Sequence, residues 1–239
     1  MSFSIILPVL NEVGNIERLI EKIINIFENT YEFEIIVVDD NSNDGTSEVV
    51  QSLVKKNKNI KHILRKCAPN LVESLNKGIE SSSKEYLIWM DCDFSHPPIY
   101  LNRIFNYLKN YDVIVFSRFL IESKRHYLSS KKKPLDYLSN FLNLICRKFL
   151  YENFTDYSSG YICIKSKLIN ESLRGYYGDY FIYLICKQIR MKRSIIELPY
   201  IENPRISGYS KTTIGKLNFI IKCYYYFLAF VRNFFLKFM

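Results

Sequence analysis

The sequence predicts an α/β fold with a mostly parallel central sheet. Three observations support this: short apolar runs alternate with segments of helical hydrophobic spacing, acidic residues directly follow several of these runs, and glycine and proline are sparse. Strands that alternate with helices form βαβ units, whose right-handed crossovers build a parallel sheet. The chain of 239 residues is long enough for one large domain with a substantial core.

The regular part of the pattern lies in the first half of the chain. Apolar runs that stop at polar turn residues predict strands, and apolar residues three and four positions apart predict helices. Strands are expected over 3–9, 34–38, 60–64, 86–90 and 113–116, and helices over 14–28, 44–54, 71–79 and 97–108. Ligands bind beyond the carboxyl ends of such strands, so the polar residues there are candidates for one active cleft.

The second half of the chain is less regular. Its expected elements are a helix over 135–150, a strand over 158–164, a helix over 180–189 and a strand over 195–198. From Thr213 onward the pattern predicts one or two helices rich in phenylalanine and tyrosine. We therefore expect one α/β domain over 1–212 and an amphipathic helical tail over 213–239.

The tail is basic as well as aromatic. Most of its charged residues fall in one arc of a helical wheel, which suits a membrane interface or docking on a partner's transmembrane helices. Its most apolar stretch, 217–236, is interrupted by Lys222 and Arg232, so no clean spanning helix is expected. The first residues also lack the basic region of a signal peptide.

The net charge of +9 is concentrated in two stretches. Neither the segment between Glu122 and Asp136 nor the segment from Asn203 to the end contains an acidic residue. Such stretches suit nucleic acid, membrane headgroups or substrate phosphates, or they are simply solvated surface. The six scattered cysteines form no CxxC pair, which favours buried free thiols in a reducing compartment.

Two carboxylates follow the fourth expected strand. Asp91 and Asp93 are alternate residues that can point toward one position, and Mg²⁺ or Mn²⁺ prefers such oxygen ligands. A metal there would neutralise the charge that develops on a departing diphosphate. The structural alternative is a turn, with Ser95 or Asp93 capping the following helix.

A second acidic pair, Asp39-Asp40, follows the second expected strand. An aspartate in this position can accept hydrogen bonds from a ribose or a base. The polar residues that come next also favour an Asx-turn. Both roles are compatible, with one carboxylate for a ligand and the other for the turn.

Six segments, in order, carry a resemblance to a known family. They are "IILPVLNEVGNI" at 5–16, "EIIVVDDNSNDGT" at 34–46, "YLIWMDCDFSHPP" at 86–98, "DVIVFSRF" at 112–119, "TDYSSGYICIKSKLI" at 155–169 and "GDYFIYLICKQIRMKRSIIELPYIENPRISGYSK" at 178–211. With them the chain resembles the dolichyl-phosphate mannose synthase-like branch of glycosyltransferase family 2. The resemblance implies a GT-A fold and a metal-dependent, inverting transfer of a hexose to dolichyl or polyprenyl phosphate. Mannose from GDP-mannose is the first candidate.

The resemblance also implies roles for individual residues. The residues implied for binding the nucleotide-sugar are Pro8, Glu12, Val38, Asp40, Asp91, Arg118, Arg205, Ser210 and Lys211. The residues implied for binding Mg²⁺ or Mn²⁺ are Asp91, Asp93 and Ser95. The residues implied for binding the acceptor phosphate are Lys131, Lys132, Lys133 and Ser139. Catalysis is expected from Asp93, Arg118, Arg205 and Lys211. An arginine fork and a lysine point charge both suit a diphosphate.

Several positions depart from the family pattern. Leu10 replaces a tyrosine or polar residue, the loop 65–73 lacks the usual glycines, and Tyr183 and Tyr209 stand where relatives often have glutamate. The arginine that usually precedes the "LSN" segment is also missing, although three lysines lie nearby. These departures bear on the sugar and the acceptor more than on the reaction type.

The chemistry of the acceptor decides whether the reaction needs a base. A phosphate acceptor has a second pKa of about 6, so it is already a dianionic nucleophile near neutral pH. Positioning, metal-assisted departure of the nucleoside diphosphate and cationic clamping then suffice. A glycan or protein hydroxyl needs a base, and Asp179 is the candidate, although helix capping also explains it. A non-catalytic nucleotide- or nucleic-acid-binding protein is the third hypothesis.

The expected partners follow from these inferences. They are a nucleotide-sugar donor, a polyprenyl phosphate acceptor, a membrane surface and, as an option for the tail, a small membrane-anchoring subunit. No nucleic acid is expected, because nothing matches a nucleic-acid-binding module. The resemblance and the cysteines imply a membrane-associated protein whose active site faces the cytosol. The membrane would be the endoplasmic reticulum in a eukaryotic cell and the inner membrane otherwise.

Overall fold

The computed structural model describes residues 1–121, 123, 134–204 and 216–239, and within the last two segments it describes side chains from Ser139 and Phe219 onward. Its strands are β1 (Ser2–Val9), β2 (Glu32–Asp39), β3 (Ile60–Leu64), β4 (Tyr86–Trp89), β5 (Val113–Ser117), β6 (Ile162–Lys165) and β7 (Ile195–Pro199). Its helices are α1 (Ile16–Phe27), α2 (Thr46–Lys56), α3 (Leu71–Glu80), η1 (Pro98–Asn106), α5 (Pro134–Phe149), η2 (Ser166–Leu168), α6 (Tyr180–Arg190) and α7 (Lys216–Leu236). These elements confirm the expected α/β pattern.

Two of the expected elements need correction. The segment after the proline pair forms η1, a 3₁₀ helix, where an α-helix was expected. Strand β6 begins at Ile162, later than the expected start at residue 158. The residues before it form a loop that bonds Phe116 of β5 through one side chain and one backbone group: Ser159 Oγ donates to Phe116 O, and Phe116 N donates to Tyr161 O at 2.9 Å.

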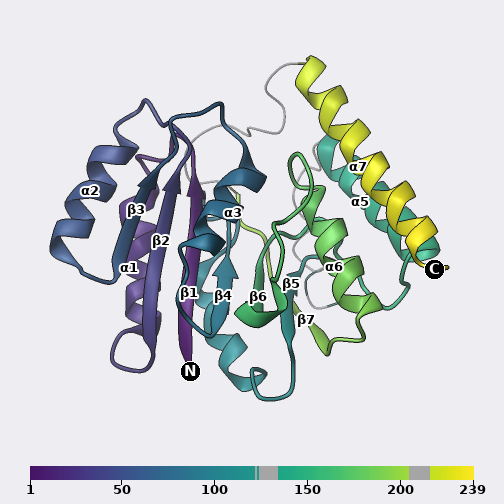
Figure 1. Ribbon diagram of the computed structural model, residues 1–239, viewed down its shortest axis with the longest axis horizontal. Coiled ribbons are helices and arrows are strands. Elements are labelled where there is room, and N and C mark those ends of the chain that lie inside the picture. The colour runs from purple at the N-terminus through teal and green to yellow at the C-terminus, as the bar shows by residue number, and fades with distance from the viewer. Residues whose placement is uncertain (122, 124–133, 205–215) are drawn as a thin grey trace.

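The strands form one sheet in the order β3-β2-β1-β4-β6-β5-β7 (Figure 1). Strands β3, β2, β1 and β4 run parallel to one another, and β5 and β7 run parallel to each other, while β6 is antiparallel to both β4 and β5. The expected mostly parallel sheet is thus confirmed. Strand order turns back at β1, which lies between β2 and β4, and in such sheets the crevice at this point binds ligands.

Each face of the sheet carries its own hydrophobic core. Ile5 and Leu7 of β1 pack on the face covered by α1, α2 and η1, whereas Ile6 packs on the face covered by α3 and α6. This alternation is the two-residue period of a strand buried on both sides. Helix α3 approaches β1 so closely that a Cβ on Gly78 would lie 2.3 Å from Ile6 Cγ2, so glycine fits there without displacing the core.

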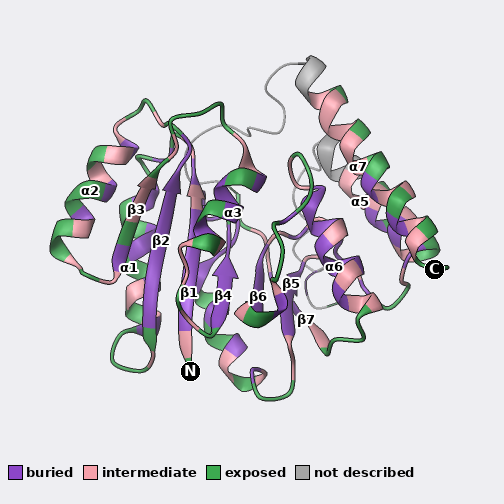
Figure 2. Cartoon of the chain, in the orientation of Figure 1, coloured by how far each residue is buried: buried purple, intermediate pink, exposed green. Residues whose placement is uncertain are grey.

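The C-terminal helix α7 lies alongside α5 and packs on α6 (Figure 1). The Phe149 ring of α5 meets Phe230 and Phe234 of α7, at centroid distances of 6.2 and 6.4 Å. The outward sides of both helices leave large apolar side chains exposed (Figure 2). These are Phe141, Leu144 and Phe149 on α5 and Ile220, Tyr224, Phe227 and Phe235 on α7.

The tail differs from expectation in one respect. The described residues contain one helix, Phe219–Leu236, that is long and apolar enough to cross a membrane by length and composition, although no clean spanning segment was expected. Only 11% of this segment is buried within the protein. The boundary expected between residues 212 and 213 lies outside the described residues.

The cysteines are free thiols, as the sequence predicted. Cys92, Cys146, Cys163 and Cys186 are buried, whereas Cys67 is exposed. Burial raises the pKa of the Cys186 thiol to about 12, so this sulfur stays protonated and unreactive at neutral pH.

Candidate active site

Loops from three strand ends meet at the carboxyl edge of the sheet. Asn11, Asn41 and Phe94 follow β1, β2 and β4 with φ values of 55°, 66° and 66°. Asparagine tolerates this left-handed region better than most residues. Asn11 N donates to Ser42 Oγ and Asn43 N donates to Asn11 Oδ1, both at 2.9 Å, so the first two loops brace each other.

A pocket of about 430 Å³ lies at this edge. Its lining residues come from the strand-end loops, from the start of α3, from the loop before α6 and from α7: Pro8, Val9, Leu10, Glu12, Asp40, Pro69, Asn70, Leu71, Ser74, Asp91, Cys92, Asp93, Tyr176, Tyr177 and Lys222. The structure thus brings together five of the residues predicted for the nucleotide-sugar or the metal, namely Pro8, Glu12, Asp40, Asp91 and Asp93. A pocket of this size accommodates a small polar ligand.

Asp39 and Asp40 have different roles: one stabilises the turn after β2, and the other is placed to contact a ligand. Asp39 is fully buried and takes the turn, where it accepts hydrogen bonds from Ser42 N at 2.8 Å and from Ser47 Oγ. Burial by itself would raise the pKa of Asp39, but the nearby His62 ring, whose Nε2 lies 3.8 Å from Asp39 Oδ2, and the hydrogen bonds from Ser47 and Ser42 lower it to about 2. Asp40 instead lines the pocket.

Two residues of the loop 65–73 hold the Asp40 carboxylate. Arg65 Nη1 forms an ion pair with Asp40 Oδ1 and also donates to Ser74 Oγ at 3.1 Å. Asn70 N donates to Asp40 Oδ2, and the Asn70 side chain caps α3. Burial raises the pKa of Asp40 despite these contacts. The loop, which lacks the family's glycines, therefore positions Asp40 through side-chain and backbone bonds.

Glu12 is set at the edge of the pocket by the start of α2. Its backbone N donates to Thr46 Oγ1 at 2.9 Å, and Thr46 N in turn donates to Asp44 Oδ1 at 3.0 Å. Asn15 Nδ2 donates to Glu12 Oε2 at 2.7 Å, which orients the carboxylate. Glu12 is 7% exposed, so its backbone and side chain are both fixed by the fold.

Asp91 and Asp93 face the same pocket from the loop after β4. Asp91 N donates to His96 Nδ1 and Ser95 N donates to Asp93 Oδ1, both at 3.0 Å, which shapes this loop. Two carboxylates suit a hard divalent cation that completes its shell with substrate phosphates and water. The described residues contain no group of three or more His, Cys, Asp or Glu arranged for a metal. Ser95 does not line the pocket, and its third-ligand role remains a prediction.

Other predicted residues lie elsewhere. Val38 is fully buried in the core beside α3 and does not line the pocket, so its side chain is a core residue. Six of the residues predicted for the diphosphate or the acceptor phosphate lie outside the described part of the chain. They are Lys131, Lys132, Lys133, Arg205, Ser210 and Lys211.

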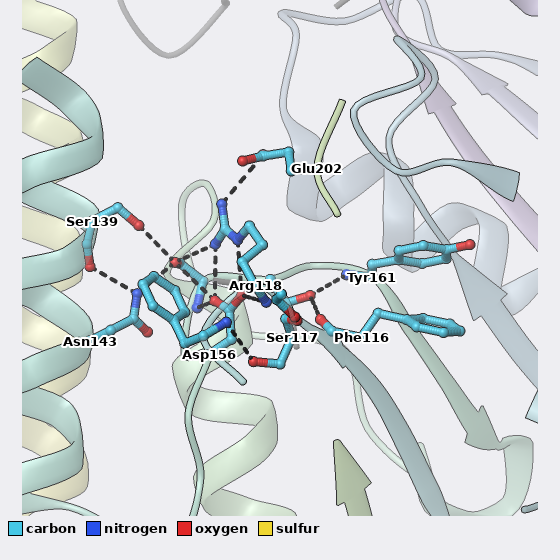
Figure 3. Close-up of polar contacts among 12 residues, drawn as sticks. Phe116, Ser117, Arg118, Ser139, Asn143, Asp156, Tyr161 and Glu202 are labelled. Carbon is cyan, nitrogen blue, oxygen red and sulfur yellow. Dashed lines mark hydrogen bonds and ion pairs between the residues drawn. The ribbon is translucent and has the colours of Figure 1, made fainter. Parts of the chain in front are cut away.

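Arg118 is held in a buried polar cluster, which we call the Arg118 cluster (Figure 3). Its Nε and Nη2 atoms each lie 2.9 Å from an Asp156 oxygen, and Nη2 also donates to Ser158 Oγ at 2.9 Å. Ser139 Oγ of α5 lies 3.2 Å from the same Ser158 Oγ. The structure thus joins two residues predicted for phosphate, Arg118 and Ser139, through one serine, although neither lines the pocket.

Glu197 of β7 fixes the loop that carries the Arg118 cluster. Its carboxylate accepts hydrogen bonds from Thr155 N at 2.7 Å, Thr155 Oγ1 at 2.8 Å and Asp156 N at 3.0 Å. Burial outweighs these bonds and raises the pKa of Glu197 to about 7. This role of Glu197 was not predicted, because no local motif distinguishes a glutamate within a strand.

We expect Glu197→Gln to flatten the dependence of stability on pH. A carboxyl pKa raised from 4.5 to about 7 means that the folded chain binds this proton more tightly than the unfolded chain. The resulting stabilisation is complete below pH 4.5 and is lost as the pH rises through 7. The difference in free energy of unfolding between wild type and variant should therefore shrink by up to a few kcal/mol over this window. Urea titrations at several pH values measure it, and a constant difference would contradict the assignment.

Asp179, the predicted candidate base, forms a turn before α6. Its carboxylate oxygens accept hydrogen bonds from Tyr176 N at 3.0 Å and from Tyr177 N at 2.7 Å. It occupies the N-cap position of α6, but its side chain bonds these preceding residues and makes no cap bond to the helix. Asp179 is 1% exposed, and burial raises its pKa. Its observed role is to hold the loop that lines the pocket.

The sequence model of Glycosyl transferase family 2 matches residues 4–173 of this chain. A dolichol-phosphate mannosyltransferase of Pyrococcus furiosus is 34% identical over 121 residues, which cover 50% of this chain and 34% of that protein. A protein of the same name from Saccharomyces cerevisiae is 31% identical over 121 residues, 50% of this chain and 45% of that protein. The match spans less than half the length of either relative.

Solved structures show the same fold. Glucosyl-3-phosphoglycerate synthase from Mycobacterium tuberculosis, in complex with Mn²⁺, UDP and glucosyl-3-phosphoglycerate, superposes with a TM-score of 0.71 at 14% identity, over 97% of this chain and 79% of that chain. The same enzyme with Mg²⁺ and UDP gives a TM-score of 0.68 at 15% identity, over 97% and 79% of the two chains. At this identity the likeness concerns the fold alone, and it confirms the expected GT-A architecture.

Proposed function

The chain belongs to glycosyl transferase family 2 and is a glycosyltransferase, and from this premise we propose that it transfers a hexose from a nucleotide-sugar to a polyprenyl phosphate. GDP-mannose is the first candidate donor, because the Pyrococcus furiosus and Saccharomyces cerevisiae relatives are named dolichol-phosphate mannosyltransferases. A single displacement inverts the anomeric carbon. The observation that carries the proposal is the convergence of four carboxylates, from the ends of β1, β2 and β4, on one pocket.

The carboxylates that follow β1 and β2 suit the nucleoside of the donor, and those that follow β4 suit its diphosphate and a metal ion. Glu12 and Asp40 lie at the ends of β1 and β2, where a fixed carboxylate accepts hydrogen bonds from a nucleoside. Asp91 and Asp93 follow β4 and would hold Mg²⁺ or Mn²⁺. Such an ion neutralises the negative charge on the departing nucleoside diphosphate. The structural relatives crystallised with Mn²⁺ or Mg²⁺ and UDP are consistent with a divalent ion.

The described residues favour a phosphate acceptor over a hydroxyl. A hydroxyl needs a general base, and the sequence candidate Asp179 already accepts two backbone N–H bonds and does not line the pocket. A phosphate dianion needs cations and hydrogen-bond donors instead. The Arg118 cluster brings an arginine and Ser139 together on the α5 side of the molecule. We assign the acceptor phosphate to that side, with Lys131, Lys132 and Lys133 as further candidates.

The apolar surface of α5 and α7 suits an acceptor that resides in a membrane. Phe141 and Leu144 on α5 are 59% and 63% exposed, and Ile220 and Phe227 on α7 are 63% and 59% exposed. Several large apolar side chains exposed on two neighbouring helices indicate an interaction site. Its aromatic residues and the basic residues of α7 suit the headgroup region of a bilayer. We infer that the protein is membrane-associated through this surface.

We expect label from a nucleotide-sugar to enter the lipid phase in a metal-dependent way. The full chain is incubated with vesicles that contain a polyprenyl phosphate, and with radiolabelled GDP-mannose, UDP-glucose or UDP-N-acetylglucosamine, in Mn²⁺ or in EDTA. Transfer from one donor in Mn²⁺ and none in EDTA would support both the reaction class and the metal. The anomeric configuration of the product, opposite to that of the donor, tests the single displacement.

Two other outcomes point elsewhere. Hydrolysis of the donor without label in the lipid phase would replace the lipid acceptor by a hydroxyl acceptor. The absence of both reactions with all three donors would contradict the proposed donor class. Undiminished transfer in EDTA would remove the metal from the proposal.

A further inference from the structure

The C-terminal helix α7 contributes Lys222 to the lining of the pocket. Three of its residues contact the loop that precedes α6: Lys222 and, one helical turn further along, Tyr225 and Tyr226. Tyr225 stacks on Tyr176 with ring centroids 4.6 Å apart and an interplanar angle of 14°. Lys222 Nζ lies 3.9 Å from the centroid of the Tyr177 ring. Both tyrosines of the loop line the pocket, and so does Lys222.

A glycine makes this close contact possible. A Cβ on Gly178 would lie 2.1 Å from the hydroxyl oxygen of Tyr226 and 3.2 Å from its Cζ. A separation under 3 Å requires that something shift, and Tyr226 is held in the helix that packs on α6. Gly178 thus lets α7 approach until the Lys222 side chain reaches the pocket.

The charge of Lys222 contrasts with that of the rest of the pocket. Among the described lining residues, Glu12, Asp40, Asp91 and Asp93 are acidic, and Lys222 carries the positive charge. A lysine ammonium and carboxylates that suit a cation line the same pocket, so an anionic group bound there together with a cation would satisfy both kinds of charge. Phosphate oxygens satisfy both sides, because lysine binds phosphate as a point charge and a hard cation bridges phosphate to carboxylates.

We propose that Lys222 binds a phosphate oxygen of a substrate in the pocket, so that the C-terminal helix is part of the active site as well as of the membrane-facing surface. This inference rests on the proposed transfer from a nucleotide-sugar. The shared chemistry is a phosphate oxygen, which belongs either to the donor diphosphate or to the acceptor phosphate. The arrangement also makes productive binding depend on α7 being docked against the loop before α6.

The test compares Lys222→Met with Lys222→Arg and with the matched control Lys237→Met. Lys237 follows the same helix, donates to Phe149 O at 3.2 Å and does not line the catalytic pocket. Loss of a charged hydrogen bond to phosphate should weaken binding roughly tenfold to a hundredfold in Lys222→Met. Lys222→Arg should retain much of the binding, and Lys237→Met should stay near wild type. Melting temperatures of all three confirm folding.

Two measurements distinguish the source of the phosphate. The dissociation constant of GDP or UDP in Mn²⁺, measured by calorimetry, rises in Lys222→Met if the donor diphosphate is the ligand. The KM for polyprenyl phosphate rises alone if the acceptor phosphate is the ligand. Either result supports the proposal, whereas values within twofold of wild type for both ligands overturn it.

A second variant tests the docking of α7 without touching the lysine. Gly178→Ala should displace the helix and reproduce the binding loss of Lys222→Met, and adding Tyr226→Phe, which removes the clashing oxygen, should restore part of it. Gly178→Ala with unchanged binding would contradict the role of docking. A wild-type chain that neither binds nucleotide nor transfers sugar overturns the proposed function together with this inference. An active wild type with an unchanged Lys222→Met overturns the inference alone.

Discussion

Replacing Asp93 by asparagine is expected to lower the rate of sugar transfer roughly a hundredfold to a thousandfold. Asp93 is 3% exposed and lines the pocket beside Asp91. The amide of asparagine has no charge to hold a divalent ion, whose neutralisation of a leaving diphosphate contributes several kcal/mol to the transition state. At about 1.4 kcal/mol for each factor of ten, a loss of about 3 to 4 kcal/mol gives this range.

The substitution separates chemistry from folding. Ser95 N donates to Asp93 Oδ1 at 3.0 Å, and the carbonyl oxygen of asparagine accepts the same bond. The melting temperature should therefore stay near that of wild type. Glu21→Gln is the matched control, because it removes one exposed carboxylate from α1, away from the pocket.

The measurement is the initial rate of transfer over a series of Mn²⁺ concentrations. The variant should need more metal to reach its lower maximum, while Glu21→Gln should follow the wild-type curve. If Asp93→Asn kept more than a tenth of the wild-type rate at limiting metal, Asp93 would be a structural residue of the loop after β4. The pocket would then have to hold its ion through other groups.

The strands and the acidic residues at their ends could be predicted because they depend on neighbouring residues in the sequence. Strands β1, β2 and β4 are apolar runs that end at polar residues, so both the strands and the acids at their ends follow from the local pattern. The division of Asp39 and Asp40 between turn and pocket follows from the strand period, because successive side chains point to opposite sides. The same reasoning leaves Val38 in the core.

The features that the sequence missed depend on contacts between distant segments. Lys222 reaches the pocket only because α7 packs on the loop before α6, and its place in an apolar helix suggested a membrane interface. Asp156 lies 38 positions from Arg118, and no local period connects the two. A charge pattern in the sequence shows that acids and bases are present, but the fold decides which of them meet.

Replacing Asp156 by asparagine is expected to destabilise the fold strongly. The side chains of Arg118 and Asp156 are 13% and 0% exposed, and Asp156 accepts bonds from three nitrogens of Arg118. Without the Asp156 charge, Arg118 keeps only the longer ion pair between its Nη1 and Glu202 Oε1, at 3.5 Å. Removing one partner of a buried pair costs about 3 to 5 kcal/mol. For a chain of this size each kcal/mol lowers the melting temperature by roughly 2 to 4 °C, so a fall of roughly 6 to 20 °C is expected.

A double-mutant cycle assigns this loss to the pair. Arg118→Met combined with Asp156→Asn removes both charges, and the double variant should be more stable than the sum of the single losses predicts, because it leaves no buried charge unpaired. The exposed pair Lys77–Glu80 provides the comparison. Its variant Glu80→Gln should cost at most about 1 kcal/mol, since exposed pairs are screened by water.

The same double-mutant cycle also tests function, because it distinguishes a structural role of Arg118 from a role in binding the acceptor phosphate. If the pair served stability alone, well-packed apolar side chains could replace it with little cost in melting temperature or in transfer. If Arg118 instead meets the acceptor phosphate, as we propose, the double variant should melt nearer to wild type than Asp156→Asn does and yet lose transfer to polyprenyl phosphate. Loss of transfer in a stable double variant would show that transfer needs the Arg118 guanidinium for more than stability. Retained transfer would make the Arg118 cluster a structural feature and remove it from the acceptor site.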